Sequence, residues 1–460
     1  MTIRPTTASG FGSRTLGVRA QAAVAAAATV NRLSRALGRG SGTVAGGRVG
    51  LLVDPGLLRS LAVARQVVLV SGTNGKTTTT RLLSAALSGL DGMGAVVSNE
   101  TGANMPAGHV AALAGAPDAS VAVLEVDEGY LGRLVEETSP EVIVLLNLSR
   151  DQLDRIAEVR MLVDRWRTAL GGPSPSPAGS SSTGSSAPRA AGTVVVANAD
   201  DPMVAYAAAT APEVRWVGAG QVWHDDAVGC PACGGRITRP SDAHWHCDRC
   251  DFARPEVVAD VVADELVLAD GSRHPIRIAL PGQFNRANAG MVAIAAVALL
   301  ESAGVRADDG GPPTVDLVLD RLASVTEVAG RFSTVVRAGH PVRLLLAKNP
   351  AGWTAIFDLL EETGDTSMPV VLSVNARIAD GLDTSWLWDV PFERLVGRPV
   401  VATGDRRLDL AVRLRYAEVA HDVVDGPVAA LDHAGRAMVP GASMEFLGNY
   451  TAFADLRRAL

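Results

Sequence analysis

The sequence has few aromatic residues, few cysteines and no long apolar run. Aromatic residues make up 4% of the 460 residues, and all four cysteines lie between positions 230 and 250. A secreted disulfide scaffold spreads its cysteines through a short chain, so this single cluster indicates a reducing compartment such as the cytoplasm. The longest apolar stretch near the start, Ala20–Val30, is too short and too weakly hydrophobic to span a bilayer. Arginines flank it on both sides and favour an amphipathic helix, with a membrane-surface helix as the alternative.

The chain also lacks an excess of positive charge. Lys and Arg total 42 against 49 Asp and Glu, a formal net charge of −7, which argues against a chain-wide nucleic-acid-binding surface. Hydrophobic residues make up 47% and charged residues 20%, a composition that excludes global disorder. The length indicates two or three domains.

Three regions follow from the pattern along the chain. Residues 1–55 predict a helix and a Gly-rich connector. Residues 56–310 alternate apolar, β-branched runs (67–70, 120–126, 141–148 and 193–197) with helical stretches, which is typical of an α/β domain with a parallel sheet. Residues 311–460 predict a second, Rossmann-like α/β domain, with further apolar runs at 343–346, 370–374, 400–403 and 429–431. The segment 173–192 is rich in Ser, Gly and Pro and predicts a solvated loop inserted in the first domain.

The strongest motif is Val67–Thr78 (VVLVSGTNGKTT), in which a strand enters a glycine-containing loop and a helix begins at Lys-Thr. This geometry turns backbone N–H groups and a helix N-terminus toward a phosphate. Lys76 can reach the β- and γ-phosphates of a nucleotide, and the Thr77 hydroxyl can ligate Mg²⁺. The alternative is a tight strand–helix turn with a chance GKT. The candidate nucleotide-binding residues here are Gly72, Thr73, Asn74, Gly75, Lys76, Thr77 and Thr78.

Acidic residues follow two further strands. Glu125 ends a buried apolar run, at the edge of the sheet where ligands bind in such folds, and could hold Mg²⁺ directly or through water. Asp127 and Glu128 could serve as helix caps instead. Asp151 and Asp154 could order the loop or metal-bound waters, or form an Asx turn and a cap.

The cysteines form two C-x2-C pairs separated by 13 residues: Cys230, Cys233, Cys247 and Cys250. Such knuckles can supply four thiolates to a tetrahedral Zn²⁺, and a site closed in this way is structural. The sequence therefore predicts a zinc ribbon at about residues 223–254. A reduced, metal-free cluster is the alternative, and His244 or His246 could replace one thiolate.

Other polar residues are candidates of lower specificity. Asn285 and Asn288 lie three apart at the start of a long helix and could bond an adenine edge or cap the helix. Arg331 and Lys348 could supply cations to a phosphate-rich site. The segment 375–389 places Asp380, Asp383, Asp389 and two Trp after a predicted strand, which suggests a site or a Trp-anchored helix.

With these residues assembled, the chain resembles the Mur ligase family, ATP-dependent enzymes that form amide bonds in peptidoglycan precursors. More closely it resembles the MurT-type subunits of lipid II isoglutaminyl synthases, which carry a four-cysteine ribbon in the ATPase domain and a segment like Asp380–Asp389 (DGLDTSWLWD). The resemblance covers about residues 30–460. The matching residues are Gly72–Thr77, Glu125, Asn147, 151–154, Asn198–Pro202 and Gly282–Asn288.

The resemblance implies amidation of lipid II. ATP would phosphorylate the α-carboxylate of D-Glu in the stem peptide, and ammonia would displace the phosphate to give D-isoglutamine. The ammonia would come from glutamine, hydrolysed by a GatD-type glutaminase in a heterodimer. A glutaminase needs a nucleophile, normally an activated cysteine, and all four cysteines here are committed to the ribbon. The glutaminase must therefore be a separate chain.

The resemblance also implies roles for individual residues. Lys76 and the loop amides would bind the β- and γ-phosphates, Thr77 and Glu125 would hold Mg²⁺, and Asn285 and Asn288 would contact the adenine end. Arg331 and Lys348 would stabilise the transferring phosphoryl group, and Asp380 or Asp383 would orient ammonia or Mg²⁺. Work at the inner face of the cytoplasmic membrane, without a membrane span, is expected.

Two rival functions remain. The first is an amino-acid-adding ligase, of the Mur or folylpolyglutamate synthase type, and the ribbon and the tryptophan segment argue against it. The second is a non-enzymatic zinc module, and the charge of −7 and the set of ATP-site residues argue against that.

Overall fold

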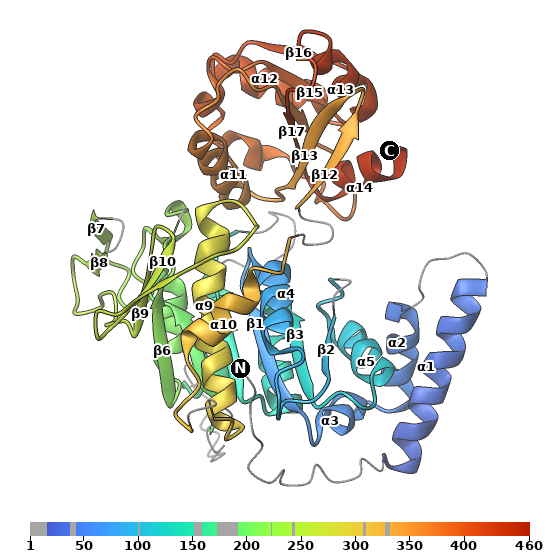
Figure 1. The fold of residues 1–460 in the computed structure, drawn as a ribbon, viewed down its shortest axis with the longest axis vertical. Helices are drawn as coiled ribbons and strands as arrows, with labels where there is room; N and C mark the ends of the chain where they lie inside the picture. The colour runs from blue at the N-terminus through green and yellow to red at the C-terminus, as the bar shows by residue number, and fades with distance from the viewer. Residues whose placement is uncertain are drawn as a thin grey trace, which may run out of the picture.

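The computed structural model describes residues 16–36, 43–99, 102–150, 159–172, 192–221, 223–241, 244–306, 310–326 and 332–460. Arg331, Asp151, Asp154 and nearly all of the predicted loop 173–192 lie outside the described residues. Two sheets organise the chain, and the second lies above the first in Figure 1.

The larger sheet has nine strands in the order β11-β10-β9-β6-β5-β4-β1-β3-β2. Its parallel centre consists of short Val-, Ile- and Leu-rich segments that are buried on both faces, as expected for parallel strands covered by helices. The strands are β1 (Gln66–Ser71), β2 (Val96–Ser98), β3 (Val121–Val126), β4 (Val142–Leu145), β5 (Val194–Asn198), β6 (Glu213–Gly218), β9 (Ala259–Val262), β10 (Glu265–Leu268) and β11 (Arg273–Pro275).

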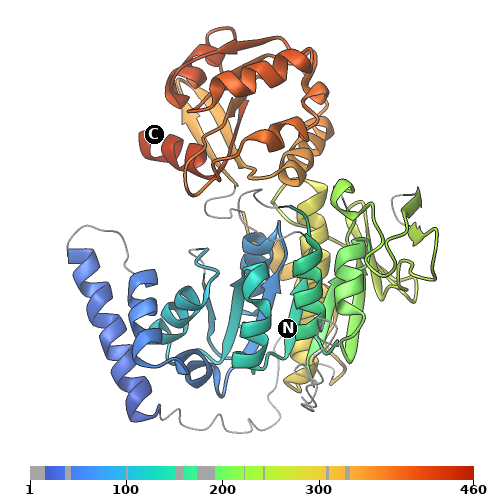
Figure 2. The same cartoon turned by 180° about the vertical axis from the view of Figure 1, so that it is seen from behind.

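Helices cover both faces of this sheet. Alternate strand residues divide between two cores: Val68 and Val70 of β1 face one helix layer, and Val67 and Leu69 face the other. The first layer, in front in Figure 1, contains α4 (Lys76–Leu87), α9 (Gln283–Ser302) and α10 (Val315–Leu322). The second, in front in Figure 2, contains α3 (Leu57–Ala62), α5 (Pro106–Gly115), α6 (Leu131–Thr138), α7 (Val159–Ala169) and α8 (Pro202–Ala208).

A helical hairpin forms the edge of the molecule beside β2 and α5 (Figure 1). It consists of α1 (Val18–Ala36), where the amphipathic helix was expected, and α2 (Thr43–Val53). The expected Gly-rich connector needs correction, because Gly46 and Gly47 lie inside α2. A Cβ on Gly47 would lie 1.9 Å from the Ala107 carbonyl oxygen, so glycine here permits a close helix–helix contact that a connector would not need.

The smaller sheet has six strands in the order β12-β13-β17-β14-β15-β16, all parallel except β12. The strands are β12 (Phe332–Arg337), β13 (His340–Leu346), β14 (Val370–Ser373), β15 (Val400–Thr403), β16 (His421–Val423) and β17 (Met444–Gly448). The helices are α11 (Pro350–Glu362), α12 (Arg407–Tyr416), α13 (Pro427–Gly435) and α14 (Tyr450–Ala459).

The apolar run 429–431 does not form a strand. It lies in α13, which begins at Pro427 and buries Ala430 and Leu431 against the sheet. The sequence analysis also gave no apolar run for β12, β16 or β17, and of these three strands β17 lies in the interior of the sheet. Glu445 of β17 is buried and accepts a hydrogen bond of 2.8 Å from Arg343. A glutamate inside the segment interrupts the apolar run that is typical of a central parallel strand.

The division of the chain at residue 310 stays a prediction. Helix α10, which follows that position, shares the core of the larger sheet with α4 and α9 through Val318 and Leu322. Among the described residues, no helix combines the length and the apolar character needed to cross a membrane.

Candidate functional site

The candidate site lies where β1, β3 and β4 end side by side at the carboxyl edge of the larger sheet. β1 pairs with β3 on one side and with β4 on the other, although β3 and β4 follow it by 50 residues or more. Chain order reverses across β1, which makes this a switch point of the kind at which open α/β sheets bind ligands.

The loop predicted to bind phosphate follows β1 and depends on two glycines. Gly75 has φ +87° and precedes the first residue of α4. A Cβ at Gly75 would lie 2.9 Å from Asn288 Oδ1, and one at Gly72 would lie 2.9 Å from Leu146 Cβ. Only glycine fits this loop between β4 and α9.

Asn147, at the end of β4, holds the loop in place. Its Oδ1 accepts the Asn74 N–H at 2.9 Å, its Nδ2 donates to the Asn74 carbonyl at 3.0 Å, and its carbonyl accepts the Thr73 N–H at 2.9 Å. Because these two loop amides are already bonded to Asn147, the candidate anion-binding N–H groups are those of the first turn of α4, beginning at Lys76. The sequence analysis attributed phosphate binding to the loop amides as a group.

Lys76 is buried and paired with Glu128. Its Nζ lies 3.0 Å from Glu128 Oε2 and donates to the carbonyls of Gly72 at 2.5 Å and Thr73 at 3.2 Å. The two paired side chains are only 3% and 8% exposed. The sequence analysis offered Glu128 only a capping role. The sequence does show acidic residues at the end of β3. Their pairing with Lys76 could not be predicted from it, because the pairing depends on β3 lying beside β1.

Thr77 and Glu125 form an oxygen pair suited to a divalent cation. Thr77 Oγ1 donates to Glu125 Oε2 at 2.8 Å, and Asn104 Nδ2 donates to the other carboxylate oxygen at 3.3 Å. A hydroxyl and a carboxylate are ligands that Mg²⁺ accepts. The two residues expected to hold Mg²⁺ therefore lie together, and their chemistry fits the ion.

The backbone of Glu125 is fixed from β2 and α5. Asn99 accepts its N–H and donates to its carbonyl, both at 2.8 Å, and His109 Nε2 lies 2.7 Å from the same carbonyl. His109 is fully buried, and burial lowers its pKa to about 4, so it is neutral at pH 7 and donates through Nε2. Both residues position the Glu125 carboxylate.

A cavity of about 230 Å³ opens from the loop toward the smaller sheet. Asn285 and Asn288 line it from α9, and Ala351 and Ile356 line it from α11. Asn288 faces Gly75, while Asn285 Nδ2 donates to the Pro281 carbonyl at 2.6 Å. The two asparagines thus line one cavity with the candidate phosphate loop, between the two sheets.

Lys348 approaches the same region from the smaller sheet. Lys348 follows β13. Burial and the neighbouring Glu128 carboxylate raise the pKa of Asp127, and the positive charges of Lys76 and Lys348 offset part of that rise. The structure therefore brings Lys348 into electrostatic range of the acidic run after β3. Arg331, its predicted companion, lies outside the described residues.

Asp380 and Asp383 stabilise local structure. Asp380 is buried and accepts the Thr451 N–H at 2.8 Å and the Thr451 hydroxyl, which fixes the start of α14. Asp383 is exposed and accepts the Ser385 N–H at 2.8 Å, which lowers its pKa. Neither residue lines the cavity. Their catalytic role stays a prediction.

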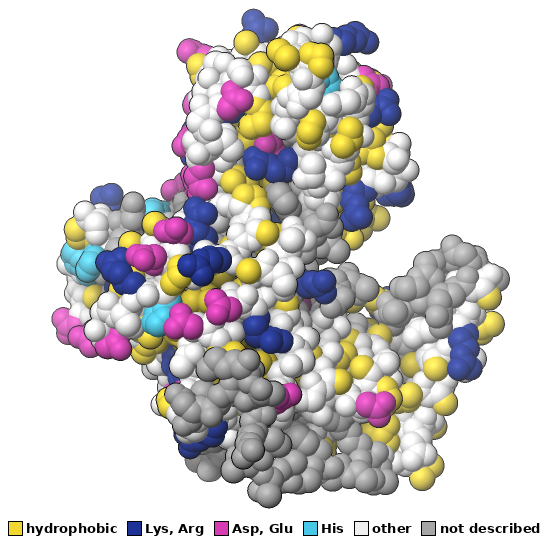
Figure 3. All heavy atoms as spheres, viewed as in Figure 1, with side chains coloured by type: hydrophobic (Ala, Val, Ile, Leu, Met, Phe, Trp, Pro, Cys, Tyr) yellow, Lys and Arg dark blue, Asp and Glu magenta, His cyan; other side chains and the backbone are white. Residues whose placement is uncertain are grey.

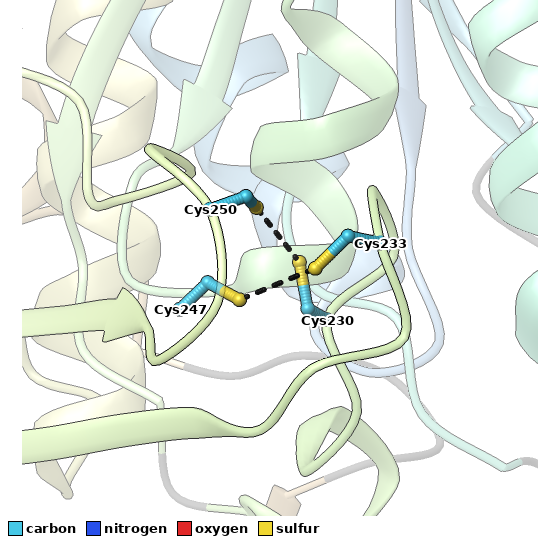
Figure 4. Close-up of side chains that lie close together, drawn as sticks. All are labelled: Cys230, Cys233, Cys247 and Cys250. Carbon is cyan, nitrogen blue, oxygen red and sulfur yellow. Dashed lines mark hydrogen bonds between the residues drawn. The ribbon is translucent and has the colours of Figure 1, made fainter.

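The four cysteines converge at the end of a small ribbon where β7 (Ile237–Ser241) begins and β8 (His244–Cys247) ends (Figure 4). Their sulfur atoms all lie within 4.8 Å of one another, with 3.5 Å between Cys233 and Cys247 and 3.8 Å between Cys230 and Cys250. Four thiolates about 2.3 Å from a tetrahedral Zn²⁺ lie about 3.8 Å apart. The cluster therefore fits a zinc ion, and the sulfur separations are too long for disulfides.

Comparisons with known proteins agree with this geometry. The profile of the Mur ligase middle domain matches residues 70–164, and that of the MurT ligase C-terminal domain matches residues 346–453. The chain is 31% identical, over 83% of each chain, to "Lipid II isoglutaminyl synthase (glutamine-hydrolyzing) subunit MurT" of Streptococcus pneumoniae R6. The chain belongs to the MurT family. A subunit of the same name from Staphylococcus aureus COL is 28% identical over 96% of this chain and 98% of the relative.

Solved structures share the fold of this MurT-type ligase subunit. MurF from Acinetobacter baumannii superposes with a TM-score of 0.59, at 16% identity over 90% of this chain and 80% of that one. Folylpolyglutamate synthase from Mycobacterium tuberculosis, complexed with ADP and AMPPCP, superposes with a TM-score of 0.55, at 18% identity over 88% and 92%. The Mur ligase-like α/β fold expected from the sequence is thereby confirmed.

Proposed function

We propose that this chain is the ATP-dependent ligase subunit of a lipid II isoglutaminyl synthase. The observation that carries the proposal is the meeting of Lys76, Thr77 and Glu125 at the switch point, with Lys348 approaching from the second sheet. The names of the relatives support the substrate, because subunits of this name span nearly the whole chain. The reaction runs at the inner face of the cytoplasmic membrane.

The chemistry begins with an unreactive carboxylate. The γ-phosphoryl group of ATP moves to an oxygen of the D-Glu α-carboxylate, giving an acyl phosphate and ADP. Ammonia attacks the carbonyl carbon, loses a proton and displaces inorganic phosphate, leaving the amide of D-isoglutamine. Phosphorylation is required because an oxide ion cannot leave a carboxylate, whereas phosphate can.

Each residue has a role in this scheme. Lys76 and the first turn of α4 bind the β- and γ-phosphates, and the cavity beside Asn285 and Asn288 takes the adenine end. Thr77 and Glu125 hold Mg²⁺, which supplies charge neutralisation to the phosphates when bound. Lys348 stabilises the transferring phosphoryl group. The cysteine cluster holds a structural Zn²⁺.

An exposed apolar face supports a separate glutaminase. Leu408, Val412 and Tyr416 repeat every four residues along α12, so they lie on one face of that helix, and all three are exposed. Trp388, also exposed, packs edge-to-face on Tyr416 with the ring centroids 5.3 Å apart. Exposed aromatic clusters of this kind mark protein interfaces. We assign this face to the GatD-type partner.

The test is an amidation assay with purified chain, ATP, Mg²⁺ and lipid II. Ammonium should replace glutamine and the glutaminase, and hydroxylamine should trap the acyl phosphate as a hydroxamate. Lys76→Ala should abolish both products. Incorporation of an amino acid in place of ammonia would instead favour the rival amino-acid-adding ligase. ATP hydrolysis without any amide would refute the proposal.

A paired variant tests the partner face. Val412→Glu should abolish glutamine-driven amidation and leave ammonium-driven amidation intact. Val439→Glu, at an even more exposed valine of the same domain, is the matched control and should affect neither. Equal loss of both activities in Val412→Glu would refute the docking assignment.

A further inference from the structure

Positive charge is concentrated at the start of the chain. Residues 1–65 contain nine Arg, no Lys and one acidic residue, Asp54, for a net charge of +8. The remaining residues contain 42 − 9 = 33 basic and 49 − 1 = 48 acidic residues, for a net charge of −15. The overall charge of −7 therefore conceals a cationic segment, and its described part is the α1–α2 hairpin with α3.

The hairpin exposes arginine and apolar side chains together. On α2, Val44, Arg48 and Leu52 lie four residues apart on one exposed face, and Leu52 is 81% exposed. On α1, Arg32 and Leu33 are exposed at one end and Val18 at the other. In Figure 3, the helix at the right edge shows hydrophobic and basic side chains and no acidic ones.

The hairpin packs on α5, the helix that contacts the candidate site through His109. A Cβ on Gly46 would lie 2.6 Å from the Ala27 carbonyl oxygen of α1, and Gly47 contacts Ala107 at the start of α5. Two residues along α5, His109 donates to the carbonyl of Glu125. A continuous series of contacts thus links the hairpin, through α5, to the proposed Mg²⁺ ligand Glu125.

We propose that the α1–α2 hairpin docks on an anionic lipid surface. Arginine beside exposed Leu and Val is the pattern of an interfacial helix, in which the cations meet lipid phosphates and the apolar side chains enter the headgroup boundary. Nucleic acid would use the arginines alone and gain nothing from Leu33 or Leu52. The inference rests on the proposed function in one respect, since a lipid-linked substrate requires the enzyme to work at such a surface.

The binding test is sedimentation of the full chain with vesicles. Vesicles of phosphatidylglycerol and phosphatidylcholine should bind it, and vesicles of phosphatidylcholine alone should not. Each arginine near an anionic surface contributes ~5-fold to the partition constant. Arg32→Glu/Arg48→Glu should thus lower binding by ~25-fold or more, and Leu33→Ser/Leu52→Ser should also weaken it. Arg415→Glu/Arg457→Glu, with two exposed arginines of the smaller-sheet domain changed, is the matched control and should bind normally.

Several outcomes would overturn the docking proposal. These are no binding by the unaltered chain, equal loss in the control variant, or binding of a single-stranded oligonucleotide that competes with vesicles and ignores the leucine changes. Arg32, Leu33, Arg48 and Leu52 are all exposed, so their substitution should leave the fold intact. Thermal unfolding of each variant checks this.

Amidation separates this inference from the proposed function. The arginine double variant should amidate lipid II in detergent micelles at the unaltered rate and lipid II in anionic vesicles at least ~10-fold more slowly. Equal rates in vesicles would refute docking. If the unaltered chain amidates neither form, the proposed function fails, and the vesicle sedimentation still decides the inference.

Discussion

The buried ion pair between Lys76 and Glu128 makes a sharp prediction about stability. Replacing Lys76 by Met removes the ammonium group and leaves the Glu128 carboxylate without the donor that lies 3.0 Å away. Breaking a buried pair in this way costs about 3–5 kcal/mol, because one charge remains buried and uncompensated. Replacing Glu128 by Gln in the same chain removes that charge, so Lys76→Met/Glu128→Gln should be more stable than Lys76→Met. The remaining cost is that of an unsatisfied amide, about 1–3 kcal/mol.

Glu128→Gln alone should be the mildest change. Lys76 Nζ keeps the carbonyls of Gly72 and Thr73 as acceptors, at 2.5 and 3.2 Å, so its charge stays solvated by the loop. The expected order of stability is therefore unaltered chain, Glu128→Gln, double variant and Lys76→Met. Both variants that lack Lys76 should be inactive in amidation. The double variant should therefore regain stability without regaining activity, which separates the two effects.

The assay is thermal unfolding without nucleotide, followed by the fluorescence of Trp166, whose Nε1 donates to the Glu128 carbonyl at 2.9 Å. A substitution of Trp166 to Phe identifies its part of the signal. A double variant less stable than Lys76→Met would refute the reasoning, because it would mean that the unpaired Glu128 carboxylate in Lys76→Met does not destabilise the fold. Full stability of Lys76→Met would refute it equally.

Four further predictions follow from the same geometry. Gly75→Ala should weaken ADP binding at least ~10-fold, because its φ is +87° and its Cβ would meet Asn288. Gly271→Ala, at φ +85° in open space and away from the cavity, is the control for backbone strain alone, and equal ADP binding by both variants would contradict this prediction. Glu125→Gln should raise the Mg²⁺ concentration for half-maximal amidation ~100-fold and Asn104→Ala only ~10-fold, since Asn104 orients the carboxylate without facing the ion; a Mg²⁺ titration decides. Burial lowers the pKa of His109 to about 4 and raises that of Asp201 to about 6, so between pH 4 and 6 the histidine makes stability rise with pH and the aspartate makes it fall. Relative to the unaltered chain, His109→Gln should therefore lose stability as pH rises through this window and Asp201→Asn should gain it, and parallel pH curves would refute both assignments. Metal analysis should find one Zn²⁺ per chain and none in Cys230→Ser/Cys247→Ser, and chelation should release the ribbon from the Ala199 carbonyl, to which Trp245 donates at 2.9 Å, with a change in tryptophan fluorescence.

Local sequence determined the parts of the site that lie within one segment. The loop between β1 and α4 needs positive φ at Gly72 and Gly75 and a helix that starts at Lys76, and each requirement is visible within a few residues. The cysteine cluster was predictable for the same reason, because two knuckles and a short spacer fix where the thiols can lie. The α/β class followed from the alternation of apolar runs and helical stretches.

Tertiary structure decided which segments meet. Thr77 contacts Glu125, and Lys76 contacts Glu128, because β3 pairs with β1, and no local propensity encodes the order of strands in a sheet. The position of β17 was hidden for a related reason, since its buried Glu445 is tolerated only through Arg343 on the neighbouring β13. The sequence by itself determined what each segment can bind, and the packing of distant segments decided which of these groups share one site, because side-chain contacts over long chain separations depend on the whole fold.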